Sequence, residues 1–417
     1  GPFSGLQEQG FTTGLFYDPN ATDQGTPADQ QARLLMQADW IRVSLAGGLA
    51  NFPLIDRFGN PVLGRQIDYN GQQAGYTLDP QEIINYAAAH DNETFHDAVQ
   101  LKVPLATPTS DRARVQNMAN DLIALGQGVP FFHAGQDMLR SKSMDRDSFN
   151  SGDWFNRLDF TYSWNNWGAG LPVASKNQDN WPLMQPLLAD PALQVNPDDI
   201  QFTAAHFREM MAIRKSSGLF RLPDEASVID RVSFLNTGPA QVPGMIVMVL
   251  ADDDGSVDVL RERIAVLFNA TDDPQDFAAP SLAGYPFALH EVQQSSADPV
   301  VGSSSWNDAT SVFSVPARTT AVFVAKRSVE DQIDLLVEDI EALVDAGVLN
   351  GGQGNALIVK LLNALAKFEN GQTNAASNQL EAFINQVEDF VADGILTAEQ
   401  GAALIAAAED IIGTIPG

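Results

Sequence analysis

Cysteine is absent from the 417 residues of the sequence. The protein therefore has no disulfides, no thiolate nucleophile and no zinc site built from sulfur. The compartment stays open, because cytosolic and secreted bacterial enzymes can both lack cysteine. Apolar residues make up 44% of the chain, yet no apolar run approaches the roughly twenty residues that span a bilayer. We expect a soluble protein of two or three domains without a membrane span.

Positive charge is also scarce. The chain has 24 Lys and Arg against 53 Asp and Glu, so its formal net charge is -29. This balance argues against nucleic acid as a partner, because binding it requires a basic surface that displaces counterions from phosphates. Neutral glycans remain compatible with such a surface.

Several common catalytic motifs are missing as well. The sequence has no Gly-x-Ser-x-Gly elbow, phosphate loop, dinucleotide fingerprint or His-Glu-x-x-His helix, and its five histidines are scattered singly. Serine hydrolases, nucleotide-binding enzymes and zinc proteases of these types are therefore disfavoured.

Residues 83–94 form the most informative stretch that is present. An apolar run from Ile83 leads directly into His90, Asp91 and Asn92. A buried parallel strand delivers polar side chains to the mouth of a β/α barrel in this way. The same tripeptide also fits an ordinary turn, in which Asp and Asn bond to their own backbone. On the tripeptide alone, the turn is the more common explanation.

Neighbouring segments shift that balance. Polar and aromatic motifs lie on both sides of the stretch, at 67–71 with 75–76, 139–143, 146–148 and 151–156. Together they resemble the pullulanase-type α-1,6-glucosidases, which are starch-debranching members of the α-amylase superfamily (glycoside hydrolase family 13). The resemblance runs from about residue 1 to about residue 325.

The resemblance implies roles for individual residues. Asp91 corresponds to the carboxylate that grips sugar hydroxyls more strongly in the transition state, and His90 to its neighbour in the same subsite. Asn92 is expected to help position the acceptor side. Arg146 and Asp147 become candidates for holding the cleaved glucose.

Aromatic side chains are further candidates for sugar binding. Tyr69 and Trp154 lie in polar loops, where rings can stack on sugar faces. Aromatic residues in loops also often cover a core, and the segment 140–180 that carries Trp154 also fits a self-packed surface loop. We retain both residues as candidates for substrate binding.

Retaining cleavage of a glucosidic bond needs a nucleophilic carboxylate about 5 Å from a carboxylic acid. We find no such pair in this sequence, since Glu93 and Asp97 begin a predicted helix and suit its dipole. In the superfamily the two groups lie on the fourth and fifth barrel strands, which would precede residue 1. The sequence also starts with Gly1-Pro2 and shows no initiator Met or signal peptide. We therefore interpret it as a fragment that is inactive alone.

The periodicity of apolar residues predicts a multidomain chain. Strands near 83–89 and 129–132, with helices at 30–45, 110–125 and 202–216, predict the C-terminal portion of a (β/α)8 TIM barrel over 1–218. Short alternating strands at 232–235, 245–250, 264–268, 312–315 and 320–324 predict an all-β sandwich over 219–326. Asp252 to Gly255 fits a hairpin turn, because the spaced ligands of a calcium loop are missing. We assign no metal-binding residues; calcium is compatible with the family resemblance.

Residues 328–417 are acidic, almost free of aromatic residues and repetitive. The segment 347–357 recurs as 394–404, and each copy ends one helix with Gly and starts another. This predicts a small all-α helical bundle. The tail resembles the FIMAH-type helical module through its core sequence Phe383 to Gln386. We expect an accessory role, with a partner that the sequence does not identify.

Two functions follow. The first is part of a debranching enzyme that hydrolyses α-1,6 bonds in pullulan, branched dextrins or amylopectin with retention, in a secreted or cell-surface bacterial protein. The second is a non-catalytic glycan-binding or cell-surface module. The sequence favours the first, because a decayed module has little reason to keep the sets at 90–92 and 146–147 together. Exposed strand edges in a partial barrel also predict self-association.

Overall fold

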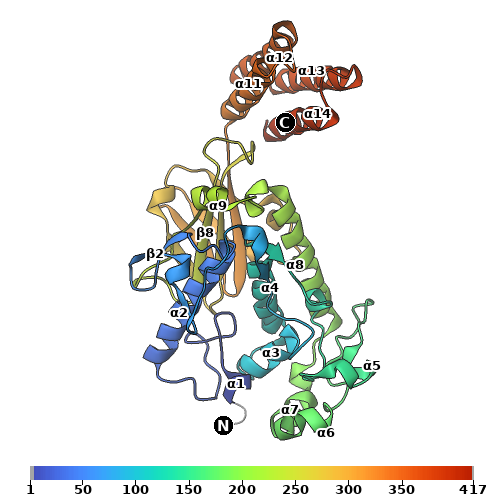
Figure 1. Ribbon diagram of the computed structural model, residues 1–417. Helices are drawn as coiled ribbons and strands as arrows, with labels where there is room; N and C mark the ends of the chain where they lie inside the picture. Colours follow the sequence, from blue (N-terminus) through green and yellow to red (C-terminus); the bar gives the residue numbers. More distant parts are fainter. Residues whose placement is uncertain (1–3, 416–417) are drawn as a thin grey trace. The chain divides into compact units, whose positions relative to one another are not determined.

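The computed structural model describes residues 4–415, and the chain divides into two compact units. The first comprises residues 1–251 and 264–324, and the second residues 252–263 and 325–417. Each unit is drawn in Figure 1 and described here by itself. Within the described residues, no helix is long and apolar enough to cross a membrane.

Several helices of the first unit begin at capping residues. The helix α2 (Pro27–Leu45) starts after Thr26, whose hydroxyl accepts the backbone N–H of Asp29, while the Asp29 carboxylate accepts the backbone N–H of Thr26. The helices of the unit are α1 (Ser4–Gln7), α2, α3 (Phe95–Lys102), α4 (Thr109–Leu125), α5 (Asp153–Asn156), α6 (Ala174–Asn177), α7 (Trp181–Ala189), α8 (Pro197–Ser216), α9 (Glu225–Arg231) and α10 (Glu291–Gln294).

Three predicted helices are confirmed as α2, α4 and α8. α4 and α8 lie side by side in Figure 1, and the buried His206 of α8 contacts the Asp121 carboxylate of α4 at 2.8 Å. Their packing also involves polar contacts with neighbouring loops, since Gln116 of α4 donates to the Gln136 backbone oxygen at 2.6 Å. Between them the chain is mostly irregular, with 3-10 turns at Gln136–Met138, Ser148–Asn150, Gln178–Asn180 and Pro191–Leu193.

A short parallel pair stands where barrel strands were predicted. β5 (Ile84–Asn85) pairs with β6 (Val129–Pro130), and α3 and α4 lie between them in sequence. The predicted strand running on to His90 is wrong in its length, since regular pairing ends at Asn85 opposite Pro130. The Phe131 N–H still donates to the Asn85 oxygen at 2.9 Å, after which the chain leaves the pair. The strand, helix, strand order is present, while a complete barrel stays a prediction.

Four short strands form two hairpins ahead of this pair. β1 pairs antiparallel with β2, and β3 with β4. Further 3-10 turns lie at Gly64–Gln66 and Pro80–Glu82. The strand bounds are β1 (Pro53–Ile55), β2 (Pro61–Leu63), β3 (Asp68–Tyr69) and β4 (Gln72–Gln73).

Two larger sheets follow, and all five predicted strands occur in them. One sheet has the order β10-β13-β12 and the other β11-β14-β9-β8-β7. They contact each other through Phe313 of β13 and Phe323 of β14, whose ring centroids lie 4.9 Å apart. The bounds are β7 (Val232–Phe234), β8 (Met245–Ala251), β9 (Arg261–Asn269), β10 (Gln275–Ala278), β11 (Phe287–Leu289), β12 (Ser305–Asn307), β13 (Val312–Val315) and β14 (Thr319–Lys326). Single 3-10 turns lie at Gly218–Phe220, Pro280–Leu282 and Val301–Ser303.

The second unit contains the predicted helical repeat. Gly347 and Gly394 adopt left-handed conformations just after α11 and α13, and Asn350 and Thr397 then cap α12 and α14. Apolar side chains from all four helices form one core. The bounds are α11 (Val329–Asp345), α12 (Gly351–Glu369), α13 (Thr373–Ala392) and α14 (Ala398–Thr414), and Figure 1 shows them gathered as a bundle.

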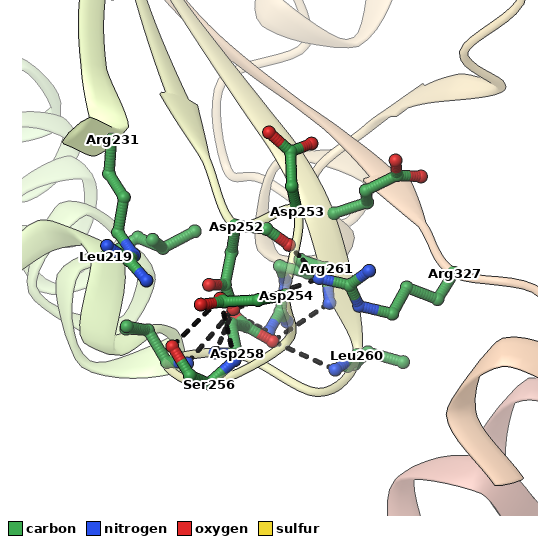
Figure 2. A network of polar contacts seen from close by, with 12 residues as sticks. Leu219, Arg231, Asp252, Asp253, Asp254, Ser256, Asp258, Leu260, Arg261 and Arg327 are labelled. Carbon is green, nitrogen blue, oxygen red and sulfur yellow. Dashed lines mark hydrogen bonds and ion pairs between the residues drawn. The ribbon is translucent and has the colours of Figure 1, made fainter. Parts of the chain in front are cut away.

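Carboxylates organise the turn between β8 and β9. Asp252 Oδ2 accepts from the backbone N–H of Asp258 at 2.7 Å, Asp258 Oδ1 accepts from that of Arg261 at 2.9 Å, and Asp254 Oδ1 accepts from the residue two positions on at 3.2 Å. Figure 2 shows these carboxylates within their own turn, beside Arg261 and Arg327. The predicted hairpin turn is confirmed, because the Asp side chains bond to nearby backbone.

The same hairpin packs with the helical unit. Val259 contacts the helical core, and a side chain at Gly255 would overlap Leu335 of α11. Residues 252–263 therefore group with 325–417. The sequence predicted a β-domain at 219–326 and a tail at 328–417, and that division assigned this hairpin to the β-domain.

Candidate functional site

The segment between β5 and α3 carries the predicted site residues. Its side chains are open to solvent: His90 is 87% exposed and Asp91 is 80% exposed. The His90 Nε2 atom lies 3.5 Å from Asp91 Oδ1. Asn92 adopts a left-handed conformation with φ of 61°, which bends the chain before Thr94 caps α3. The bend leaves Asp91 accessible at the end of the parallel pair.

Arg146 joins this segment from a distant part of the sequence. Its Nη2 donates to Asn92 Oδ1 at 3.2 Å, and its Nε lies 2.8 Å from Glu93 Oε1. The structure thus brings the predicted residues Asn92 and Arg146 together. Glu93 was missed as a contributor, because α3 begins only at Phe95 and Glu93 lies outside the helix that was expected to explain it.

Asp147 points to a different partner. Its carboxylate lies 2.6 Å from the Lys176 ammonium, and its backbone N–H donates to Asp145 Oδ1 at 2.9 Å. The buried Asp145 also accepts from Ser151 Oγ at 2.6 Å. Asp147 follows Arg146 in the sequence. Among the described residues, its carboxylate contacts Lys176 and shows no contact with Arg146 or Asp91.

A buried carboxylate lies beneath the exposed pair. Asp97 of α3 accepts from Ser141 Oγ and from the backbone N–H of Lys142, the latter at 2.8 Å. Burial raises the pKa of Asp97 to about 6, although these hydrogen bonds act to lower it. The Lys142 ammonium in turn donates to the backbone oxygen of His90 at 2.8 Å. Sequence reasoning missed this connection, because only the folded loop brings residue 141 to residue 97.

His133 follows β6 and faces the same region. Burial lowers the pKa of His133 to about 4, and the positive charges of Arg140 and Lys142 and the nearby His90 act in the same direction. Arg140 Nη1 lies 3.3 Å from His133 Nε2 and donates to the Ala134 oxygen at 2.9 Å. His133 is therefore neutral at neutral pH and can accept or donate one hydrogen bond without adding charge.

The two aromatic candidates lie elsewhere. Tyr69 packs edge-on against Trp40, with ring centroids 4.8 Å apart, and both line a cavity of about 400 Å³ with Tyr86. Trp154 is 76% exposed and lines a separate cavity of about 790 Å³ with Trp164. The described part of the chain shows no contact of either candidate with His90 or Asp91.

Metal ligands are not grouped in the described residues. Across 4–415, no cluster of three or more His, Asp or Glu side chains is arranged to hold a metal ion. The exposed carboxylate and guanidinium groups offer hydrogen bonding to a polar ligand.

Exposed carboxylate and guanidinium side chains that follow a parallel strand pair can hydrogen-bond a polar ligand. Comparisons with known proteins specify the class. Residues 162–326 match the family model for alpha-1,6-glucosidases, pullulanase-type, C-terminal, and residues 333–413 match the FIMAH domain. The chain thus carries a pullulanase-type C-terminal region followed by a FIMAH domain, which confirms both resemblances.

Relatives agree with this assignment. The chain is 43% identical over 334 residues to pullulanase 1, chloroplastic, of Arabidopsis thaliana, covering 78% of this chain and 35% of that protein. It is 35% identical over 334 residues to pullulanase of Klebsiella pneumoniae, covering 77% of this chain and 30% of that protein. The chain therefore spans about a third of the length of these curated relatives.

Solved structures of pullulanases are also similar to this chain. The crystal structure of ligand-free PulA from Klebsiella pneumoniae matches with a TM-score of 0.73 and 33% identity, covering 79% of this chain and 31% of that chain. The maltotriose complex of PulA from the same organism matches with the same TM-score and identity, covering 79% of this chain and 35% of that chain. The fold of the matched region is accordingly that of the corresponding part of pullulanase.

Proposed function

We propose that these residues act as part of a starch-debranching enzyme that hydrolyses α-1,6-glucosidic bonds with retention. The observation that supports this most directly is the exposed His90 and Asp91 pair in the segment between β5 and α3, where Arg146 bonds to Asn92 and Glu93. An accessible carboxylate held beside a guanidinium suits a sugar whose hydroxyls need both acceptors and donors.

In this proposal Asp91 stabilises the transition state. As the glucose ring flattens toward an oxocarbenium ion, hydrogen bonds from its hydroxyls to a fixed carboxylate strengthen and lower the barrier. The nucleophilic Asp and the acid Glu come from residues outside this sequence. The 417 residues alone are then expected to release no sugar from an α-glucan.

The proposed architecture extends what the structure describes. Residues 1–218 would form the last portion of a (β/α)8 barrel, 219–326 a β-sandwich and 328–417 an accessory helical module. An α-glucan is the proposed substrate, since a Klebsiella pneumoniae relative has been crystallised with maltotriose. A secreted or cell-surface location remains part of the proposal; one plant relative is named as chloroplastic.

The test uses the complete gene product that includes these residues. We expect reducing ends to be released from pullulan, and Asp91→Asn to lower kcat by on the order of a thousandfold because the amide loses the negative charge. The matched control is Asp308→Asn, an exposed aspartate after β12, which should leave kcat unchanged.

Two results would contradict the proposal. Full activity in Asp91→Asn would remove the assigned role of that carboxylate. A complete gene product that binds pullulan but never cleaves it would instead favour the second candidate, a non-catalytic glycan-binding module. Isothermal titration with pullulan oligosaccharides distinguishes binding from catalysis in either case.

A further inference from the structure

A completely buried irregular segment lies beneath the proposed site. Residues 141–145 form no helix or strand, yet each is at most 1% exposed. Connecting segments normally run over the surface, because buried backbone groups need hydrogen-bond partners. A segment this deeply buried therefore needs specific partners to hold its shape.

Asp97 accepts several of the hydrogen bonds that hold this segment. It is itself fully buried, and it accepts from Ser141 Oγ, from the backbone N–H of Lys142 and from the backbone of Met144. Thr94 already caps the start of α3 through the backbone N–H of Asp97, at 3.1 Å. The Asp97 carboxylate thus joins the start of its own helix, through the Thr94 side chain, to the loop.

The loop is strained where Asp97 holds it. Ser143 has φ of 51° and Met144 has φ of 65°, both in the left-handed region that ordinary residues avoid. Such conformations persist only where surrounding contacts determine them. The hydrogen bonds from 141, 142 and 144 to one carboxylate are contacts of this kind.

The loop then holds both sides of the exposed pair. Before Asp91, the Lys142 ammonium donates to the backbone oxygen of His90 at 2.8 Å. After Asp91, Arg146 contacts Asn92 at 3.2 Å and Glu93 at 2.8 Å. Asp91 itself has few restraints, since its side chain is largely in solvent. Its placement accordingly depends on these flanking contacts.

We propose that Asp97 is a positioning residue, which fixes the 141–146 loop so that Lys142 and Arg146 hold the His90–Asp91 segment in its reactive geometry. This inference rests on the proposed function, because it assigns Asp97 to the same site. Asp97 does not touch substrate. Its effect is expected in catalysis as well as in folding, since a shift of about 1 Å in a reacting group can cost roughly a hundredfold in rate.

The experiment compares variants of the complete gene product on pullulan. Asp97→Asn replaces one acceptor oxygen with an NH2 group. This donor then faces the N–H and O–H donors of the loop, so a hydrogen bond is lost. We expect it to lower kcat by about ten- to a hundredfold with KM changed by less than about threefold. Lys142→Met removes the donor to His90 but leaves the acceptors of Asp97 in place, and we expect the same direction of change. Lys142→Arg retains a cationic donor and should restore most of the activity.

Two controls distinguish a positioning role of Asp97 from a role in folding alone. Asp39 is an equally buried carboxylate, bonded to Arg42 at 2.9 Å and to Arg57 in a different part of the first unit. Asp39→Asn should lower the unfolding temperature while kcat stays within about twofold of the parent. In the Asp91→Asn background, Asp97→Asn should add less than about threefold, because the carboxylate that it positions is already gone.

Every outcome bears on the inference. Unchanged kcat in both Asp97→Asn and Lys142→Met overturns it, as does an equal loss with and without Asp91. If Asp97→Asn does not fold, Lys142→Met and its rescue by Arg decide the question. Full activity of Asp91→Asn alone would overturn the proposed function and the positioning role together, whereas an inactive Asp91→Asn beside fully active Asp97 and Lys142 variants would overturn the positioning role only.

Discussion

His96 and Asp97 are neighbours on α3, and burial shifts their pKa values in opposite directions. Burial lowers the pKa of His96 to about 3, helped by the positive charge of Arg112, and it raises the pKa of Asp97 to about 6. His96 packs edge-on against Trp167, with ring centroids 5.8 Å apart. The depth of this burial depends on a segment seventy residues away in the sequence, which no local pattern reveals.

This burial predicts a pH dependence of stability. In the unfolded chain His96 binds a proton near pH 6.5, whereas in the folded chain it does so only near pH 3. Stability from neutral His96 is therefore present above pH 6.5 and is lost as pH falls toward 3. His96→Gln should make the decline between pH 6.5 and pH 4 shallower by roughly 1.4 kcal/mol per pH unit. Urea unfolding followed by tryptophan fluorescence measures this, because all six tryptophans lie in the first unit.

His206 provides a control with the opposite sign. Burial alone would lower its pKa, but the Asp121 carboxylate at 2.8 Å raises the pKa above the usual value. Stability from charged His206 is therefore fully present below pH 6.5 and is lost as pH rises through the raised pKa, so His206→Asn should remove a loss of stability above pH 6.5 and leave the slope between pH 6.5 and pH 4 unchanged. Equal slopes for the parent and both variants would contradict the assignment of these shifts.

At the scale of elements, a helix or strand could be predicted where its bounds are set by residues close in the sequence. α2 and α8 follow from apolar periodicity and capping residues, α4 follows from periodicity, and β13 (Val312–Val315) matches its predicted range. The short β5 could not be predicted, because the length of a strand depends on its partner segment, here Val129–Pro130, which is distant in the sequence. In the site, His90, Asp91, Asn92 and Arg146 could be proposed from motifs, whereas the bonds between Asp97 and the 141–142 segment require the fold.

The repeated helix pairs allow a sharp test of packing. Gly401 in α14 lies against Val391 of α13, and an added methyl group would overlap the valine side chain. Gly401→Ala should therefore destabilise the helical unit by roughly 1–3 kcal/mol, despite the better helix propensity of alanine. Circular dichroism at 222 nm during thermal unfolding reports the loss.

The same helix offers a matched control. Gly413 has no neighbouring atom within contact distance, so Gly413→Ala should leave stability unchanged or raise it by up to about 1 kcal/mol. The double variant Gly401→Ala with Val391→Ala should recover part of the loss, since it vacates the overlapping volume. Equal effects of Gly401→Ala and Gly413→Ala would show that helix propensity, rather than close packing, governs the position.

At the scale of the whole molecule, the parallel pair leaves apolar side chains in solvent. Ile84, Tyr86, Val129 and Phe131 are all exposed; Ile84 lies opposite Val129 in the register, and the rings of Tyr86 and Phe131 have centroids 6.2 Å apart. Parallel strands are normally covered on both faces, and contiguous exposed apolar surface favours association. The hydrophobic effect thus acts between molecules at this position when nothing else covers it.

We therefore predict that the 417-residue chain self-associates through this surface. In sedimentation velocity, the mean sedimentation coefficient should rise with protein concentration for the parent chain and stay constant for the double variant Ile84→Lys, Phe131→Lys, because two buried ammonium groups would oppose the contact. Leu362→Lys, at an exposed apolar position on α12, is the control and should associate like the parent. If Leu362→Lys abolished association while the double variant did not, the contact would belong to the helical unit, and the strand pair would be stable in solvent without a covering partner.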